Sequence, residues 1–254
     1  MRIALGSLNA LLGLAYLLVG FMTLSDLKRG WKTMGFSHFG AAWVGLAFTC
    51  GPHHLIHATH LLMENRQAGG LEVLAVGVGV PPGLVFVGLR IEALLGGRGD
   101  RYIANSPAWL QAIAPAAAVY ITVLAASLMR LGFVGIPDKV IPNVVLVAMY
   151  LWVAYYLIRT QLRNRMSLQG WSLSGVSLSI VFPTCALMHV LYATYAATGL
   201  YNDVDWHGLI IDWISVPAVV YFLWVVRGLY RQSLKDWNRK IYDSVPDRAA
   251  AVAA

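Results

Sequence analysis

The sequence has little charge. Charged residues make up 12% of the 254-residue chain, against about 25% in ordinary soluble domains. Hydrophobic residues make up 58%, and the mean hydropathy is +0.63. A chain of this composition cannot cover a normal water-facing surface, so we expect an all-α integral membrane protein whose main partner is the lipid bilayer. Its net charge of +7 then marks one side of a membrane rather than a nucleic-acid interface, and we expect no nucleic-acid partner.

Several functional classes lack their required residues. Two cysteines cannot form the disulfide framework of a small secreted scaffold. The chain has no GxxxxGK[ST] loop for binding nucleotide phosphates. Its last apolar stretch, between Asp212 and Arg227, has no lysine that could form a Schiff base with retinal. Nucleotide-driven and light-driven functions are therefore not expected.

Gaps between charged residues locate the membrane spans, because a spanning helix needs roughly 20 residues with few charges. Seven such gaps occur. They run from Arg2 to Asp26, Lys32 to Glu64, Glu72 to Arg90, Arg101 to Arg130, Lys139 to Arg159, Arg165 to Asp203, and Asp212 to Arg227. The sequence therefore predicts seven transmembrane helices in a domain covering residues 1–232.

The distribution of Lys and Arg predicts the orientation. Fifteen of the 19 basic residues fall in the loops and tail on one side of the predicted bundle. Because basic residues concentrate on the cytoplasmic side, we expect the N-terminus outside and a basic cytoplasmic tail at 233–254. The compartment predicted by this pattern is a bacterial-type plasma membrane.

An internal repeat organises the chain. A shift of 135 residues superposes 35–59 on 170–194 with eight identities, where about two are expected by chance. Gly35, Ser37, Gly40, Thr49, Cys50, His54, Ala58 and Thr59 match Gly170, Ser172, Gly175, Thr184, Cys185, His189, Ala193 and Thr194. A slip of one residue also aligns Tyr16 with Tyr150. The predicted first three helices therefore repeat as the last three.

The repeat predicts a domain plan. Repeat A covers 1–95, a linker helix covers 108–131, and repeat B covers 140–232. Four helices separate equivalent helices, so the two repeats are expected to be parallel about an axis along the membrane normal. In arrangement this is similar to the three-plus-one-plus-three plan of small sugar transporters, a likeness of architecture without their sequence signatures.

A histidine-rich face lies in the second predicted span. His53, His54, His57 and His60 fall within about 120° of a helical wheel. Imidazoles three or four residues apart on a helix can share a transition-metal ion, and polar clusters within a bilayer are costly without such a role. We therefore predict a metal or haem site toward the outer face. The candidate metal ligands are His53, His54, His57, His60, His189, His207, Cys50, Cys185 and Asp212.

The cofactor has two alternatives at this point. His54 and His189, from matching positions of the repeat, are the natural opposed ligands of a b-type haem. The other histidines could hold a separate ion of copper, zinc or iron. Cys50 and Cys185 are either ligands or small residues that allow close helix packing.

Three functions are compatible with such a site. The sequence does not identify catalytic residues for any of them. The first is redox chemistry, as an electron-transfer protein or oxidoreductase, with further membrane subunits as partners. The second is transport of a transition metal. The third is zinc-dependent hydrolysis. In having histidines on several helices, the chain resembles seven-span hydrolases of the ceramidase and adiponectin-receptor type, although it lacks their HxxxH pairing on a late helix.

Overall fold

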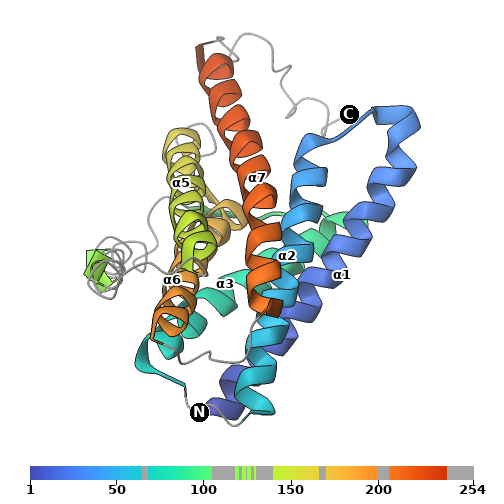
Figure 1. The fold of residues 1–254 in the computed structure, drawn as a ribbon. Coiled ribbons are helices and arrows are strands. Elements are labelled where there is room, and N and C mark those ends of the chain that lie inside the picture. Colours follow the sequence, from blue (N-terminus) through green and yellow to red (C-terminus); the bar gives the residue numbers. More distant parts are fainter. Residues whose placement is uncertain are drawn as a thin grey trace, which may run out of the picture.

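The protein is a bundle of long helices (Figure 1). The computed structural model describes residues 1–64, 68–104, 118–119, 122–123, 125–126, 129, 140–165, 170–198 and 206–238, without the side chains of 34, 104, 206–209 and 233–238. The long helices in this part are α1 (Arg2–Met34), α2 (His38–Leu62), α3 (Gly70–Leu94), α5 (Ile141–Asn164), α6 (Leu173–Ala197) and α7 (Trp206–Asn238). Two short strands, β1 (Tyr102–Ala104) and β2 (Gly170–Ser172), accompany them.

Five of the described helices are long and apolar enough to cross a membrane: α1, α3, α5, α6 and α7. Their outward faces carry large apolar side chains, such as Leu14 on α1 and Trp224 on α7, which are 59% and 58% exposed. Such faces are stable against lipid rather than water. The predicted all-α membrane protein is thus supported at this level.

Helix α2 does not belong to this group of five, and four histidines lie in its second half. It is 25 residues long, about 37 Å at 1.5 Å per residue, which is enough to cross the hydrocarbon core. It packs against α1 on one side and α7 on the other. In this position, His57 and His60 are buried.

The helices pack in a regular pattern. Helix α1 packs on α2, and α5 packs on α6. The third helix of each half crosses to the other half, so that α3 packs on α6 and α7 packs on α2. Side chains from both halves therefore meet at the centre of the bundle.

The first turns of α2 and α6 have the same cap. The hydroxyl of Ser37 accepts a hydrogen bond from the backbone N–H of Gly40 at 3.1 Å. The hydroxyl of Ser172 accepts one from Gly175 at 3.0 Å. Such caps satisfy an otherwise unpaired N–H and stabilise a helix start by about 1 kcal/mol. The matching Ser and Gly residues of the predicted repeat thus begin the two helices that carry the histidines.

Two parts of the predicted domain plan lie outside the described residues. The linker helix expected at 108–131 is described only at isolated positions, and residues 239–254 of the tail are not described. The beginning of the predicted tail, from residue 233, continues α7 as helix to Asn238.

The small sheet was not predicted from the sequence. Strands β1 and β2 pair antiparallel, with Tyr102 opposite Ser172 and Ala104 opposite Gly170. Next to it, the carboxylate of Asp100 accepts hydrogen bonds from the hydroxyls of Ser172 and Ser174, at 2.6 and 2.9 Å, and from the backbone N–H of Ser174 at 2.9 Å. The glycine-rich loop 96–100 therefore ties the end of α3 to the start of α6.

We expect Asp100→Ala to lower the free energy of unfolding by about 1 kcal/mol at neutral pH, the usual effect of losing a helix cap. Partial burial opposes ionisation, but the hydrogen bonds from Ser172, Ser174 and Arg101 outweigh it and hold the pKa of Asp100 below its ordinary value. This stabilisation is present above the pKa of the unfolded chain and is lost as pH falls through the lower folded pKa. Thermal unfolding in detergent at pH 7 and well below about pH 3.9 measures both effects.

The exposed Asp26 on α1 provides the control for this variant. Asp26→Ala should change stability by less than about 0.5 kcal/mol. Equal losses for Asp26→Ala and Asp100→Ala, or a loss at Asp100 that persists unchanged in acid, would show that Asp100 does not act as a cap.

Candidate metal centre

Side chains from three helices converge at the centre of the bundle. His53 of α2, His189 of α6 and Asp212 of α7 each offer one ligand atom, and these atoms all lie within 4.8 Å of one another. The side chains of His53 and Asp212 are 11% and 8% exposed, and His189 is buried. Helix α7 from the second half of the chain packs on α2 from the first half, so ligands from both halves meet.

His53 is held in one orientation. Its Nδ1–H donates to the backbone carbonyl of Thr49, one turn earlier, at 3.0 Å. Because a carbonyl oxygen can only accept, Nδ1 carries the hydrogen and Nε2 faces the carboxylate of Asp212, 2.5 Å from Oδ1. Without a metal, this contact requires a proton between the two atoms. A bound cation would take the place of that proton.

Asn143 of α5 orients the other two ligands. It is buried, and its amide nitrogen donates to Oδ2 of Asp212 at 2.6 Å. Its carbonyl oxygen therefore faces His189 and accepts from Nδ1–H at 2.6 Å. The lone pair of His189 is then on Nε2. Histidine ligands of metals commonly donate their other N–H to a carbonyl or carboxylate in this way.

His54 has a matching environment in the other half of the bundle. Its Nδ1–H donates to the side-chain oxygen of Asn9 at 2.8 Å, while the amide nitrogen of Asn9 donates to the carbonyl of Leu5 at 2.9 Å. The ring of Tyr16 stacks on His54 with centroids 5.8 Å apart. In the same way Tyr150 stacks on His189 at 5.3 Å. Only the second set includes a carboxylate, which is why the convergence of ligands is on that side.

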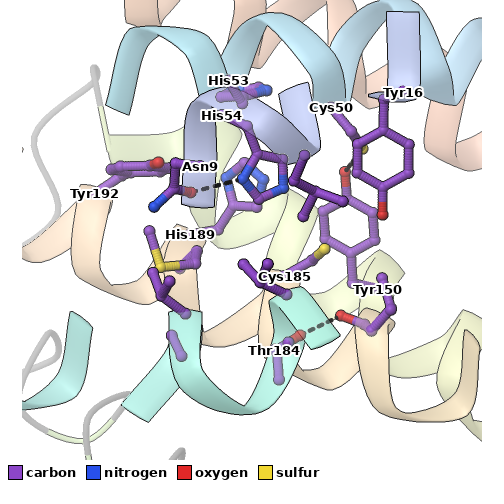
Figure 2. Close-up of a pocket in the computed structure, with 17 residues that line it drawn as sticks. Asn9, Tyr16, Cys50, His53, His54, Tyr150, Thr184, Cys185, His189 and Tyr192 are labelled. Atoms are coloured by element: carbon purple, nitrogen blue, oxygen red, sulfur yellow. Dashed lines mark hydrogen bonds between the residues drawn. The ribbon is translucent and has the colours of Figure 1, made fainter. Parts of the chain in front are cut away.

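A small cavity lies between these two sets (Figure 2). It measures about 40 Å³, room for an ion with two or three waters by the usual volume per buried water, about 10–15 Å³. His53, His54 and His189 line it, and Tyr16 and Tyr150 lie toward its other end. A porphyrin would need the helices to move apart.

The two cysteines also line the cavity. Cys50 and Cys185 are both free thiols, and neither is fully buried. The sulfur of Cys50 lies 3.5 Å from the hydroxyl of Tyr150. Neither cysteine belongs to the group of converging ligands, so their role as ligands stays a prediction.

The remaining histidines of α2 have separate partners. His57 Nε2 lies 3.3 Å from Oε1 of Glu72 on α3, and His60 Nδ1 lies 2.6 Å from Oε2 of Glu64. The predicted histidine face thus divides into successive imidazole–carboxylate pairs instead of a single cluster. The side chain of His207 lies outside the described part of the chain.

Asn9 and Asn143 were missed in the sequence. They are related by a shift of 134 residues, the same shift that relates Tyr16 to Tyr150. Each asparagine lies seven residues before its tyrosine, which places both on the same face of one helix, about two turns apart. The repeat therefore contains a signal for both asparagines, although asparagine is not a preferred metal ligand.

We expect Gly79→Ala to destabilise the bundle next to the cavity. Gly79 of α3 packs directly on Thr184 of α6, and a Cβ at this position would overlap the threonine side chain. Overpacking of this kind typically costs 1–3 kcal/mol. Thermal unfolding in detergent measures it.

Gly77 of the same helix gives a matched control, since a Cβ there meets no atom within 4 Å. Gly77→Ala should leave the unfolding temperature unchanged or raise it, because alanine favours the helix. If the two alanine variants unfold at the same temperature, α3 and α6 do not approach at Gly79.

The three ligands suit a transition metal with open coordination positions. Two imidazoles and one carboxylate bind iron, zinc or copper, and three protein ligands leave coordination positions open for a water or substrate. His53 and His189 both line the cavity, so an ion between them borders it. No protein family, characterised protein or solved structure is detectably similar to the chain. We therefore infer its function from the chemistry of this site.

Proposed function

We propose that the protein is a membrane-embedded metalloprotein that holds a single transition-metal ion between His53, His189 and Asp212 and uses it in redox chemistry. Electron transfer and the oxidation of a small substrate are the two forms this chemistry can take. The observation that carries the proposal is the convergence of these three ligands from α2, α6 and α7 within 4.8 Å. Two imidazoles with one carboxylate and open positions are the ligand set of non-haem iron oxygenases.

The cavity wall favours redox chemistry over hydrolysis. A zinc hydrolase needs a general base beside the metal-bound water. Among the described residues that line the cavity, none is an Asp or Glu. Glu72 and Glu64 lie against His57 and His60 instead. The wall does contain thiol and phenol groups, which can be oxidised.

The packing beyond the cavity favours a fixed ion over transport. Trp43, Phe86, Phe182 and Phe222 form a buried cluster, with ring centroids 4.7 Å apart for Trp43 and Phe86 and 5.4 Å apart for Phe182 and Phe222. Trp43 lies ten residues before His53 on α2, about 15 Å along the axis. An ion moving in that direction would leave its ligands for an aromatic core.

The small cavity favours an ion over haem. A b-type haem between His54 and His189 remains the alternative cofactor, because each of these residues has its Nε2 lone pair free of the asparagine contacts. A cavity of about 40 Å³ accommodates an ion without rearrangement, whereas sites for larger ligands measure roughly 300 Å³ or more.

We also infer the two parallel repeats and the seven-span topology. The repeat is supported by the matching serine caps, by the two Asn–His–Tyr sets and by the crossed packing of α3 on α6 and α7 on α2. Seven spans with the N-terminus outside place the C-terminal end of α2 at the outer face. His53 lies nine residues from that end, about 14 Å deep, with lipid and further membrane subunits around the bundle.

A redox titration of the purified, iron-loaded or copper-loaded protein tests the proposed function. The optical or paramagnetic resonance signal of the ion should change reversibly between oxidant and reductant. His53→Ala should lose the signal, while His38→Ala, at the opposite end of α2, should keep it. An ion that binds only as zinc, or a signal that ignores oxidant and reductant, would contradict the redox proposal.

A further inference from the structure

Imidazole–carboxylate pairs follow α2 from the site to the surface. His53 pairs with Asp212, His57 with Glu72, and His60 with Glu64. The histidines are spaced by four and three residues, which keeps them on one face of the helix. The axial steps are about 6 and 4.5 Å at 1.5 Å per residue.

Of the three pairs, the one at the end of α2 is the most exposed and the middle pair is the most buried. The side chains of His57 and Glu72 are each 1% exposed, and His60 is 7% exposed. Glu64 is 49% exposed and therefore reaches the aqueous side. The row begins at the surface and ends at the converging ligands.

The inner steps are connected by one aromatic ring. Tyr192 of α6 lies with its ring centroid 5.9 Å from that of His57 and 6.2 Å from that of His53. The buried pair and the metal centre thus share a wall. His53 and His57, one helical turn apart on α2, both lie beside the ring of Tyr192.

Helix capping accounts for only one of the two carboxylate oxygens of Glu72. Its Oε2 accepts the backbone N–H of Gly69 at 2.7 Å and so caps the start of α3. Its Oε1 faces His57 instead. A cap requires neither the second oxygen nor the burial of a histidine beside it, and burying two ionisable groups is costly unless they have a further role.

We propose that His60 with Glu64 and His57 with Glu72 form the entry path of the metal ion, with His57 and Glu72 as a buried transit site. This inference rests on the proposed metal centre. Carboxylates attract the cation, and each imidazole supplies a nitrogen ligand as the ion passes from one pair to the next. In the part of the chain that the structure describes, the exposed group of this path is Glu64 at the end of α2, so the ion reaches its site from that side of the membrane.

Loading kinetics of the purified full-length chain in detergent test the path, with Co²⁺ as the probe because its bound form absorbs visible light. Glu64→Gln is at an exposed position and should preserve the fold. Glu72→Gln keeps an oxygen for the cap at Gly69. We expect both to slow loading by about tenfold at low salt, the lower range of electrostatic steering, with unchanged final stoichiometry. His38→Gln, at the other end of α2, should load at the rate of the unaltered protein.

The outcomes separate the path from the site. Unchanged loading rates in both glutamine variants, with cobalt still bound, would overturn the path alone. Slow loading in His38→Gln as well would overturn it too, since the effect would not depend on the end of the helix. No cobalt binding by the unaltered protein would overturn both the path and the metal centre.

Discussion

Asp212→Asn is expected to remove the bound ion. Asparagine keeps the shape of the side chain but loses the negative charge and one strong oxygen ligand beside His53, 2.5 Å away. Changes in outer residues of metal sites already cost 10–100-fold in affinity, so we expect a loss above about 100-fold for this ligand. Metal content after purification, together with a titration in chelator buffers, measures the change.

The same variant separates the two cofactors. A haem between His54 and His189 does not need Asp212 as a ligand, so Asp212→Asn should leave a haem in place. Asp26→Asn, on the exposed part of α1, controls for the loss of one negative charge. Full metal content in Asp212→Asn would place the ion elsewhere.

Asn143→Leu should weaken metal binding without removing a ligand. The variant loses the hydrogen bonds to His189 Nδ1 and Asp212 Oδ2, both 2.6 Å long. Both ligands are then free to turn, and we expect a loss of about 10–100-fold in metal affinity. A buried N–H of His189 without an acceptor should also reduce stability by about 1–3 kcal/mol. Metal titration and thermal unfolding measure the two effects.

Asn9→Leu is the matched control, because Asn9 bonds to His54 as Asn143 bonds to His189. It should reduce stability by a similar amount and leave the affinity for the ion unchanged. Equal losses of affinity in both variants would mean that His54 and His189 hold the cofactor together, as in the haem alternative.

Five of the seven charge-free gaps coincide with helices that are long and apolar enough to cross a membrane. The gap from Arg165 to Asp203 contains α6, Leu173–Ala197, and the gap from Glu72 to Arg90 lies inside α3. The helix ends were less accessible, because they depend on contacts such as that of Asp100 with Ser172. The three-residue strands β1 and β2 left no pattern in the sequence that could distinguish them from loop.

The sequence predicted a metal site formed by histidines, but it predicted only part of how the side chains are arranged. Helical spacing placed His53 on the polar face of α2, and the repeat pointed to His189; both lie in the group of converging ligands with Asp212. A helical wheel gives the direction of a side chain but not the helix it meets. The pairing of His53 with Asp212 follows from the packing of α7 on α2, which no local pattern encodes. The same holds for His57, which meets Glu72 of α3 instead of a second histidine.

The asparagines show a different limit. Metal ligands are mostly His, Cys, Asp and Glu side chains, so a pattern of ligands in the sequence does not include the residues that orient them. Asn143 determines which nitrogen of His189 carries the lone pair, yet it binds no ion itself. Its role became visible only with its two partners on α6 and α7 in contact.

Elemental analysis of the purified protein, combined with its absorption spectrum, tests the central claim most directly. We predict about one transition-metal ion per chain and no Soret band. A preparation with no stoichiometric metal even after loading, or one with a Soret band and no separate ion, would contradict a metal centre formed by His53, His189 and Asp212.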